Sequence, residues 1–308
     1  MLATFDHSEF EPEALLARKR ETVTVCLPTR ETAATIGAVV AEIAALRELG
    51  LVDQLLVVDA DSGDGTAAAA RAAGAEVFSE NELMADFGPT QGKGDAMWRA
   101  LSVATGEIVV YLDGDVRDFG GHYVTGLLGP LLTSSKAELA KGFYRRPLAI
   151  DSVEIEDGGG RVTELTAKPL LELLAPELAA FRQPLAGEVA ARRSLLDSIP
   201  YATGYGVEIA MLVDVWRARG LDRMAQVGLG SKRNAHQGLA ELSGMAREVI
   251  EALLARTGAD TGAGGEDAGS AALPLPPTAR RRLETRPPMA ELTASARVAA
   301  VVGSGSTA

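Results

Sequence analysis

Two periodicities of apolar residues alternate along the first part of the chain. Short runs of β-branched and aliphatic residues recur, each bounded by polar residues, glycine or proline, and between them apolar residues repeat every three or four positions, as on one face of a helix. The runs predict strands at 22–27, 54–58, 76–78 and 107–112, and the helical spacing predicts helices at 36–46, 66–73 and 92–103. Strands that alternate with helices in this way form a mainly parallel sheet with helices on both faces. The pattern therefore predicts an α/β fold.

The rest of the chain contains segments that differ in hydrophobic pattern and in composition. The pattern beyond the first half predicts strands at 139–144, 148–155 and 225–229, and helices at 161–174, 207–216 and 239–254. The composition becomes rich in Gly, Ala and Pro after Gly258, which is typical of a segment that cannot bury enough apolar surface to fold alone. We divide the chain into a lead-in (1–20), a first half (21–135), a second half (136–258) and a tail (259–308) that is disordered or docked at an interface.

Composition excludes several classes of protein. The 308 residues are 47% hydrophobic and 23% charged, which excludes a disordered or fibrous chain. The net charge of −12 argues against binding to nucleic acid or an anionic membrane, since both need a basic surface. The single cysteine, Cys26, cannot form an internal disulfide, the lead-in lacks the features of a signal peptide, and no apolar run is long enough to span a membrane. We therefore expect a cytoplasmic protein.

Asp113, Gly114 and Asp115 directly follow the apolar run that ends at Leu112. A strand end of this kind lies at the carboxyl edge of the sheet, where open α/β folds bind ligands. Two carboxylates on one turn suit Mg²⁺ or Mn²⁺ shared with a diphosphate, because these hard cations take oxygen ligands and keep positions open for phosphates. The alternative is a solvated acidic loop.

Two glycine-rich loops suit anions. Lys93 lies between glycines where a helix is predicted to begin, which suits a diphosphate, although a surface loop has the same composition. Residues 158–164 (GGGRVTE) place a guanidinium and a hydroxyl after a flexible run, which suits a carboxylate or phosphate. Basic residues at 141, 145 and 146 extend that cluster or pair with surface acids.

Three further polar residues have a structural and a functional interpretation. Asp59 ends the second strand, where it could form a hydrogen bond with a nucleoside; the structural interpretation of this segment is that glycines form the turn and Asp64 or Thr66 caps the next helix, and both can hold at once. Glu208 begins an apolar helix, where it serves as a partner of the helix dipole or faces the reaction. His236 follows the last predicted strand and is either exposed or a metal ligand.

In order along the chain, these motifs resemble those of the glucosyl-3-phosphoglycerate and mannosyl-3-phosphoglycerate synthases. The matching segments are PTRE (28–31), VVDAD (57–61), QGKG (91–94), DGD (113–115), FYRRP (143–147), GGGRVTEL (158–165), PLAGE (184–188) and GYGVEI (204–209). The resemblance implies a GT-A type fold, which is a Rossmann-like, mainly parallel sheet with helices on both faces, plus a smaller acceptor-binding C-terminal part. It also implies a retaining hexosyltransferase, with 21–135 as the nucleotide-sugar-binding half and 136–258 as the acceptor-binding half.

The resemblance assigns roles to individual residues. Glu208 and Asp115 would be catalytic, and Asp115 and His236 would bind a divalent metal, Mg²⁺ or Mn²⁺. The donor-binding residues would be Pro28, Arg30, Glu31, Asp59, Lys93, Asp113, Gly114 and Leu185. The acceptor-binding residues would be Gly160, Arg161, Val162, Thr163 and Asn234. The partners would be a nucleotide sugar and 3-phosphoglycerate, and the protein would be a homodimer.

Three positions depart from the family pattern. Thr32 stands where family members carry a nucleoside-contacting glutamate, and Ala60 stands where the UDP-glucose enzymes carry serine. In the metal-binding segment, usually RxHRN, Asn234 takes the place of the histidine, and His236 lies two residues further on. The first two departures favour GDP over UDP and hence mannose, with a UDP-glucose-dependent glucosyl-3-phosphoglycerate synthase as the alternative.

Two other classes share some of these features. A sugar nucleotidyltransferase has a similar sheet and metal-binding acids, but its glycine-rich basic signature should follow the first strand, where this chain has PTRE. A binding module without catalytic activity should lack the acids or the acceptor arginine, and Asp113, Asp115 and Arg161 are all present. Hexosyl transfer is therefore the favoured function.

Overall fold

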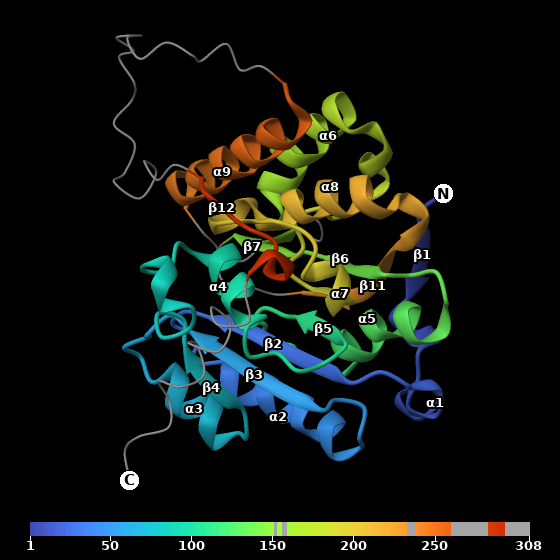
Figure 1. The fold of residues 1–308 in the computed structure, drawn as a ribbon, viewed down its shortest axis with the longest axis vertical. Helices are drawn as coiled ribbons and strands as arrows, with labels where there is room; N and C mark the ends of the chain where they lie inside the picture. The colour runs from blue at the N-terminus through green and yellow to red at the C-terminus, as the bar shows by residue number, and fades with distance from the viewer. Residues whose placement is uncertain (151–152, 156–158, 233–237, 260–282, 293–308) are drawn as a thin grey trace.

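A mixed sheet of eight strands runs through the middle of the computed structural model, which describes residues 1–150, 153–155, 159–232, 238–259 and 283–292 (Figure 1). All neighbouring strands are parallel except β9, which is antiparallel to both of its neighbours. In spatial order the strands are β1 (Ala3–Asp6), β11 (Met224–Ser231), β6 (Leu139–Arg145), β9 (Val189–Arg192), β5 (Ile108–Tyr111), β2 (Val23–Thr29), β3 (Gln54–Asp59) and β4 (Glu76–Ser79).

Helices cover both faces of the sheet, because the central strands are apolar on both sides. Along β2, Val25 and Leu27 pack into one hydrophobic cluster and Cys26 into the other, as the two-residue repeat of a strand requires. The first cluster is covered by α1 (Pro12–Arg18), α2 (Ile36–Glu48), α3 (Thr66–Ala72) and α5 (His122–Thr133). The second is covered by α4 (Lys93–Ala100), α6 (Lys168–Leu174), α7 (Arg193–Leu196), α8 (Val207–Arg219) and α9 (Leu239–Thr257). The α/β fold class predicted from the sequence is thus confirmed.

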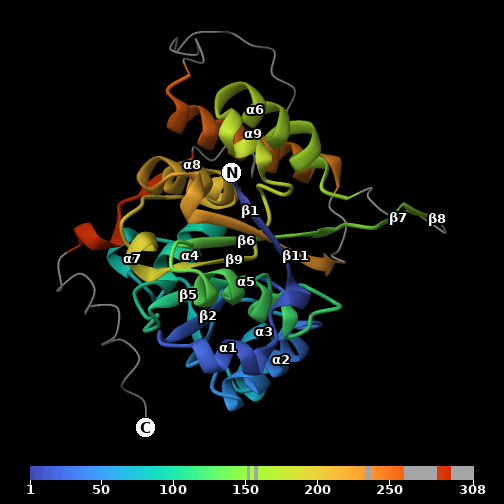
Figure 2. The same cartoon turned by 90° about the vertical axis from the view of Figure 1, so that its right-hand side faces the viewer.

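Two parts of the chain differ from the sequence prediction. The lead-in contributes β1, which pairs with β11 at the edge of the sheet. The sequence did not predict this strand, because its four residues lie beside acidic residues and carry no clear strand signal. Residues 148–155 do not join the main sheet; their described parts form a separate antiparallel pair, β7 (Leu148–Ile150) and β8 (Val153–Ile155), which projects from the body (Figure 2). The two predicted halves share one continuous sheet, since β6, β9 and β11 of the second half continue the strands of the first.

The tail is also different from its prediction, because residues 283–292 pack against the core (red in Figure 1). β12 (Thr285–Arg286) pairs with β10 (Tyr201–Ala202), and Met289 is fully buried. The Arg286 guanidinium donates to both oxygens of the buried Asp95, at 2.9 and 2.7 Å. This segment is therefore part of the folded domain, while the remainder of the predicted tail, 260–282 and 293–308, lies outside the described residues.

None of the described helices is long and apolar enough to cross a lipid bilayer.

Candidate active site

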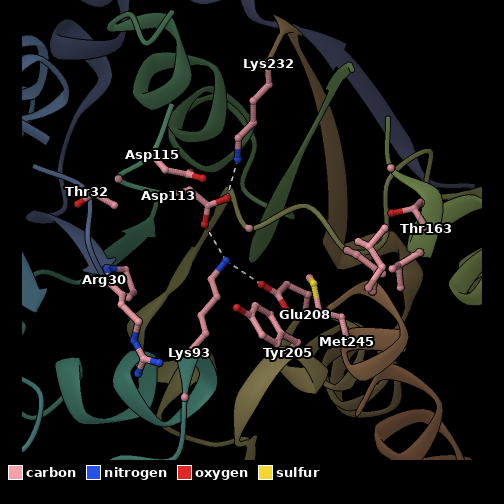
Figure 3. A pocket seen from close by; sticks show the side chains of 18 of the residues that line it. Arg30, Thr32, Lys93, Asp113, Asp115, Thr163, Tyr205, Glu208, Lys232 and Met245 are labelled. Carbon is pink, nitrogen blue, oxygen red and sulfur yellow. Dashed lines mark hydrogen bonds and ion pairs between the residues drawn. The ribbon is translucent and has the colours of Figure 1, made fainter. Parts of the chain in front are cut away.

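A cavity of about 480 Å³ opens at the carboxyl ends of β2 and β5, between these strand ends and the helices α4, α8 and α9 (Figure 3). It is lined by residues that the sequence pattern selected from widely separated motifs. These are Pro28, Arg30, Lys93, Asp113, Gly114, Asp115, Gly160, Arg161, Val162, Thr163, Leu185 and Glu208. The fold therefore brings twelve of the predicted site residues to one cavity.

Charged side chains of alternating sign cross the floor of this cavity. Lys93 Nζ lies 2.7 Å from Asp113 Oδ1 and 2.9 Å from Glu208 Oε1 (Figure 3). Lys232 Nζ lies 2.6 Å from Asp113 Oδ2 and also pairs with the fully buried Glu188. The order Glu188, Lys232, Asp113, Lys93, Glu208 forms a continuous chain of three acids and two lysines, which we call the charge chain.

Ion pairing in the charge chain favours the charged forms of Asp113, Lys93 and Lys232 despite their burial. Burial alone would raise the pKa of Asp113, but Lys232 and Lys93 outweigh it and hold this pKa well below its usual range. Burial likewise opposes the charged form of Lys93, but Asp113 and Glu208 outweigh it, and the pKa of Lys93 is raised. The pKa of Lys232 is raised in the same way, mainly by Asp113 and then Glu188. At neutral pH the cavity thus presents ionised groups for a charged ligand.

Local backbone features place these groups. Gly92, at φ 85°, turns the chain into α4, so that Lys93 begins the helix. The Gly114 carbonyl accepts a hydrogen bond of 2.7 Å from Thr35 Oγ1, which holds the turn after β5. A Cβ on Gly187 would lie 2.5 Å from both Asp113 Oδ1 and Lys93 Nζ, so only glycine leaves room for this ion pair.

One end of the cavity carries the residues predicted to contact the donor nucleoside. Pro28, Arg30 and Thr32 line it, together with Ala60 and Glu80 from the neighbouring strand ends. Arg30 NH2 lies 3.6 Å from Glu80 Oε1. In Figure 3, Arg30 and Thr32 lie on one side of the Asp113–Lys93 pair and Thr163 on the other.

Two predicted donor-binding residues do not line the cavity. Asp59 is buried and accepts hydrogen bonds from Thr29 Oγ1 and from the backbone and side chain of Ser62, at 3.2, 2.9 and 2.8 Å. Its carboxylate therefore holds the turn after β3, a role that the sequence did not predict for it. The exposed Glu31, at φ 52°, uses its backbone N–H to bind Ser62 Oγ.

The opposite end carries the predicted acceptor residues. Gly160, Arg161, Val162 and Thr163 line it, and Arg146 adds a second guanidinium whose buried Nε has no hydrogen-bond partner. Of the other two basic residues in the predicted cluster, Arg145 is exposed and does not line the cavity. Lys141 is buried, which lowers its pKa to about 8, and donates to the Ala186 carbonyl at 2.6 Å.

The predicted metal-binding segment cannot be placed, since Asn234 and His236 lie outside the described residues. Within the described part of the chain, no group of three or more His, Cys, Asp or Glu side chains could hold a metal ion. Asp115 lies beside Asp113 at the cavity (Figure 3).

The sequence prediction missed several residues of the site, among them Glu80 at the nucleoside end. Lys232, Tyr205 and Met245 line the cavity, and Glu188 lies beneath it, paired with Lys232. Tyr205 and Glu188 lie within motifs that were recognised but carried no assigned role. Lys232 follows β11 directly, and a lysine at the carboxyl end of an apolar strand is the signal that could have identified it.

Replacing Lys232 with methionine should lower the free energy of unfolding by about 3 kcal/mol, because Glu188 would stay buried without its partner. Urea unfolding of the variant measures this loss. The double variant Lys232→Met/Glu188→Gln should recover part of the stability, since it removes both charges. Equal stability of the wild type and the single variant would show that the pair contributes nothing.

Comparisons with known proteins agree with this geometry. A model of glycosyl transferase family 2 matches residues 24–133. The chain is 46% identical to glucosyl-3-phosphoglycerate synthase of Mycolicibacterium smegmatis over 265 residues, which are 84% of this chain and 87% of the relative. The mannosyl-3-phosphoglycerate synthase structure of Rubrobacter xylanophilus aligns with a TM-score of 0.82 at 45% identity, covering 94% of this chain and 97% of that one.

A further solved structure contains ligands. The glucosyl-3-phosphoglycerate synthase of Mycobacterium tuberculosis in complex with Mn²⁺, UDP-glucose and phosphoglyceric acid aligns with a TM-score of 0.80 at 41% identity, covering 94% of this chain and 98% of that one. Fold, site and family match together define a GT-A glycosyltransferase. Within that class, the chain belongs to the glucosyl-3-phosphoglycerate synthase family of hexosyltransferases, which confirms the resemblance found in the sequence.

Proposed function

We propose that this enzyme transfers glucose from UDP-glucose to the 2-hydroxyl of 3-phosphoglycerate. The observation that carries the proposal is the cavity itself, where the charge chain separates a nucleoside end from an anion-binding end rich in guanidinium groups. The named glucosyl relative and the UDP-glucose complex support this donor. The expectation of GDP-mannose, drawn from Thr32 and Ala60, is not confirmed.

The mannosyl enzyme remains the second candidate because one observation favours it. The Rubrobacter mannosyl-3-phosphoglycerate synthase matches this chain as well as the glucosyl structure does, with TM-scores of 0.82 and 0.80. Mannose and glucose differ only in the orientation of one hydroxyl, and no side chain lining the cavity is dedicated to that difference.

The cavity fits a divalent cation shared with the donor diphosphate. Asp113 and Asp115 place carboxylates, the hard oxygen donors that such a cation takes, at the same end of β5, and both Asp113 oxygens pair with lysines in this structure. A bound Mg²⁺ or Mn²⁺ would offset the charge that develops on the departing diphosphate. Mn²⁺ accompanies UDP-glucose in the Mycobacterium tuberculosis structure, which supports this assignment.

Individual side chains would then have separate roles in the transfer. Lys93 would donate hydrogen bonds to the diphosphate and stabilise the leaving group. The acceptor 2-hydroxyl oxygen forms the new bond to C1 of the hexose as the bond from C1 to the donor phosphate oxygen breaks, and the hydroxyl proton passes to that phosphate oxygen. Glu208, held by Lys93, would orient the sugar. Attack from the side of the leaving group retains the configuration at C1.

Initial rates with a panel of UDP-glucose, GDP-glucose and GDP-mannose, each with 3-phosphoglycerate and Mn²⁺, test the donor. We expect UDP-glucose to have the highest kcat/KM. A higher value for GDP-mannose would favour the mannosyl candidate, and no nucleoside diphosphate release with any donor would contradict hexosyl transfer. The homodimer and the cytoplasmic location stay predictions.

Arg161→Ala should raise the KM for 3-phosphoglycerate by about 10- to 100-fold, since a charge-assisted hydrogen bond contributes about 1.5–3 kcal/mol. The KM for the donor should change little, because Arg161 lies with Thr163 at the anion-binding end. Steady-state kinetics with each substrate varied in turn measure both values. A raised donor KM with an unchanged acceptor KM would show that the two ends are assigned in reverse.

A further inference from the structure

A buried carboxylate lines the nucleoside end of the cavity and has no role in the transfer described above. Glu80 follows β4 directly, and only 5% of its surface is exposed. Within the described part of the chain its carboxylate forms an ion pair with Arg30, at 3.6 Å, and the Arg30 side chain is 66% exposed. An acid that is nearly enclosed yet borders a ligand cavity is placed to contact what the cavity binds.

The backbone around Glu80 is held from both sides. Its N–H donates to the Asp59 carbonyl at 2.9 Å, and its carbonyl accepts hydrogen bonds from Thr90 Oγ1 and Arg99 NH1, at 3.0 and 3.3 Å. Such anchoring fixes the backbone from which the Glu80 side chain extends, which supports selective recognition.

The expected positions of the other donor groups leave the nucleoside for the end of the cavity that Glu80 lines. If the cavity holds a nucleotide sugar, as proposed above, the diphosphate lies at Lys93 and Asp113 and the hexose lies towards the acceptor end. The nucleoside must then extend towards Arg30, Thr32 and Glu80. Thr32 lines the same end, and its buried Oγ1 has no hydrogen-bond partner among the residues that the structure describes.

We propose that Glu80 selects the nucleobase of the donor by forming hydrogen bonds with its Watson–Crick edge. The proposal rests on the proposed function only in taking a nucleotide sugar as the donor.

The protonation state of Glu80 determines which base it matches. Uracil presents one N–H donor between two carbonyl acceptors, so a neutral carboxyl group, which has one acceptor and one donor, can form two hydrogen bonds with it. An ionised carboxylate would instead place its second oxygen against a uracil carbonyl. Guanine presents two adjacent donors, N1–H and the 2-amino group, which suit the ionised carboxylate.

The surroundings of Glu80 favour the neutral form. Burial raises its pKa to about 7, against the opposing effect of Arg30; Asp61 and Asp95 raise this pKa and Arg99 lowers it. Below this pH the carboxyl group is mostly protonated and suits uracil, and above it the ionised group suits guanine. The preference for UDP over GDP should therefore fall as the pH rises.

Calorimetric titration of the full chain with UDP and with GDP, both with Mn²⁺, tests the proposal at about pH 6 and about pH 8, either side of that pKa. For the wild type, we expect the ratio of UDP to GDP affinity to fall by about tenfold between these pH values, the effect of one good base-reading hydrogen-bond pair. The ratio is the readout because changes in the diphosphate and the metal cancel in it.

Glu80→Gln should remove this pH dependence. A glutamine amide has one acceptor and one donor group, like the neutral acid, so the variant should keep the UDP preference at both pH values and bind GDP about tenfold more weakly than the wild type at about pH 8. Pyrophosphate, which has no base, should bind the variant and the wild type equally. Glu82→Gln, at an exposed position two residues away, is the matched control and should behave as the wild type.

A ratio that changes neither with pH nor in Glu80→Gln would overturn the proposal, as would an equal loss of UDP, GDP and pyrophosphate binding, which indicates a structural role. Because no acceptor is present, the titration is independent of the transfer reaction. A wild type that binds UDP with the expected ratio but does not glucosylate 3-phosphoglycerate would refute the proposed function and not the role of Glu80.

Discussion

Lys93→Met should lower kcat by about 100- to 1,000-fold, which is the usual effect of removing one preorganised donor to a developing negative charge. Lys93 is one of the two lysines of the charge chain and lies within hydrogen-bond distance of both Asp113 and Glu208. Methionine keeps much of the length and packing of the side chain but removes the charge. Single-turnover rates with saturating UDP-glucose and 3-phosphoglycerate measure the loss in the chemical step itself.

A lysine in a surface ion pair provides the control for the Lys93 variant. Lys168 forms an ion pair with Glu164 at 2.6 Å on the outer part of the acceptor half and does not line the cavity. Lys168→Met should keep kcat within about twofold of the wild type, because exposed ion pairs contribute little. A kcat of Lys93→Met within tenfold of the wild type would contradict the assignment of Lys93 to the leaving group.

Ending the chain after Gly258 should lower the free energy of unfolding by about 5 kcal/mol, enough to unfold many domains of ordinary stability. The truncation removes Arg286, which leaves Asp95 buried with one fewer cation at a cost of about 3 kcal/mol. It also removes Met289, whose burial contributes about 2 kcal/mol. Thermal and urea unfolding measure the change.

Two further variants separate these contributions. Arg286→Met in the full chain should reproduce the electrostatic part, since it removes the cation and leaves Met289 in place. Ending the chain after Leu292 should leave stability close to that of the full chain, because every described contact of residues 283–292 is kept. A fully stable, active protein ending at Gly258 would contradict the stabilising role assigned to residues 283–292.

Truncation should also affect catalysis, because the removed segment contacts α4, the helix that begins with Lys93. Asp95, the partner of Arg286, lies two residues after Lys93 and accepts a hydrogen bond of 2.9 Å from the backbone N–H of Gln91. The same buried carboxylate thus connects the C-terminal segment to the loop that carries the proposed diphosphate lysine. We therefore expect the truncation to lower activity as well as stability.

The elements that the sequence predicted correctly are those with local signals. β2, β3 and β5 are apolar on both faces because helices cover both sides of the sheet, and this made their runs easy to recognise. β9 (Val189–Arg192) was missed, because four residues of the type VAAR have neither the length nor the β-branched content of a typical strand. Its pairing with β5 and β6 arises from the tertiary fold.

In the candidate site too, the residues in local motifs could be predicted and those that the tertiary fold brings together could not. Asp113 and Lys93 could be predicted because each belongs to a short motif at a strand or helix end. The second lysine on Asp113 is Lys232, 119 residues further along the chain, and its burial depends on strands that meet only in the folded sheet. Asp59 has the same local signal as Asp113, yet its Oδ1 accepts hydrogen bonds from the hydroxyl groups of Thr29 and Ser62 and its Oδ2 from the Ser62 backbone N–H. This difference depends on contacts and not on the motif.

The most direct test of hexosyl transfer is the mass of the product formed from UDP-glucose labelled with ¹³C in the glucose ring, with unlabelled 3-phosphoglycerate and Mn²⁺. We expect a single new species with the mass of one labelled hexose added to phosphoglycerate, less one water, formed in equal amount to UDP. Formation of free labelled glucose with UDP, or no consumption of UDP-glucose while the protein remains folded, would contradict glucosyl transfer to 3-phosphoglycerate.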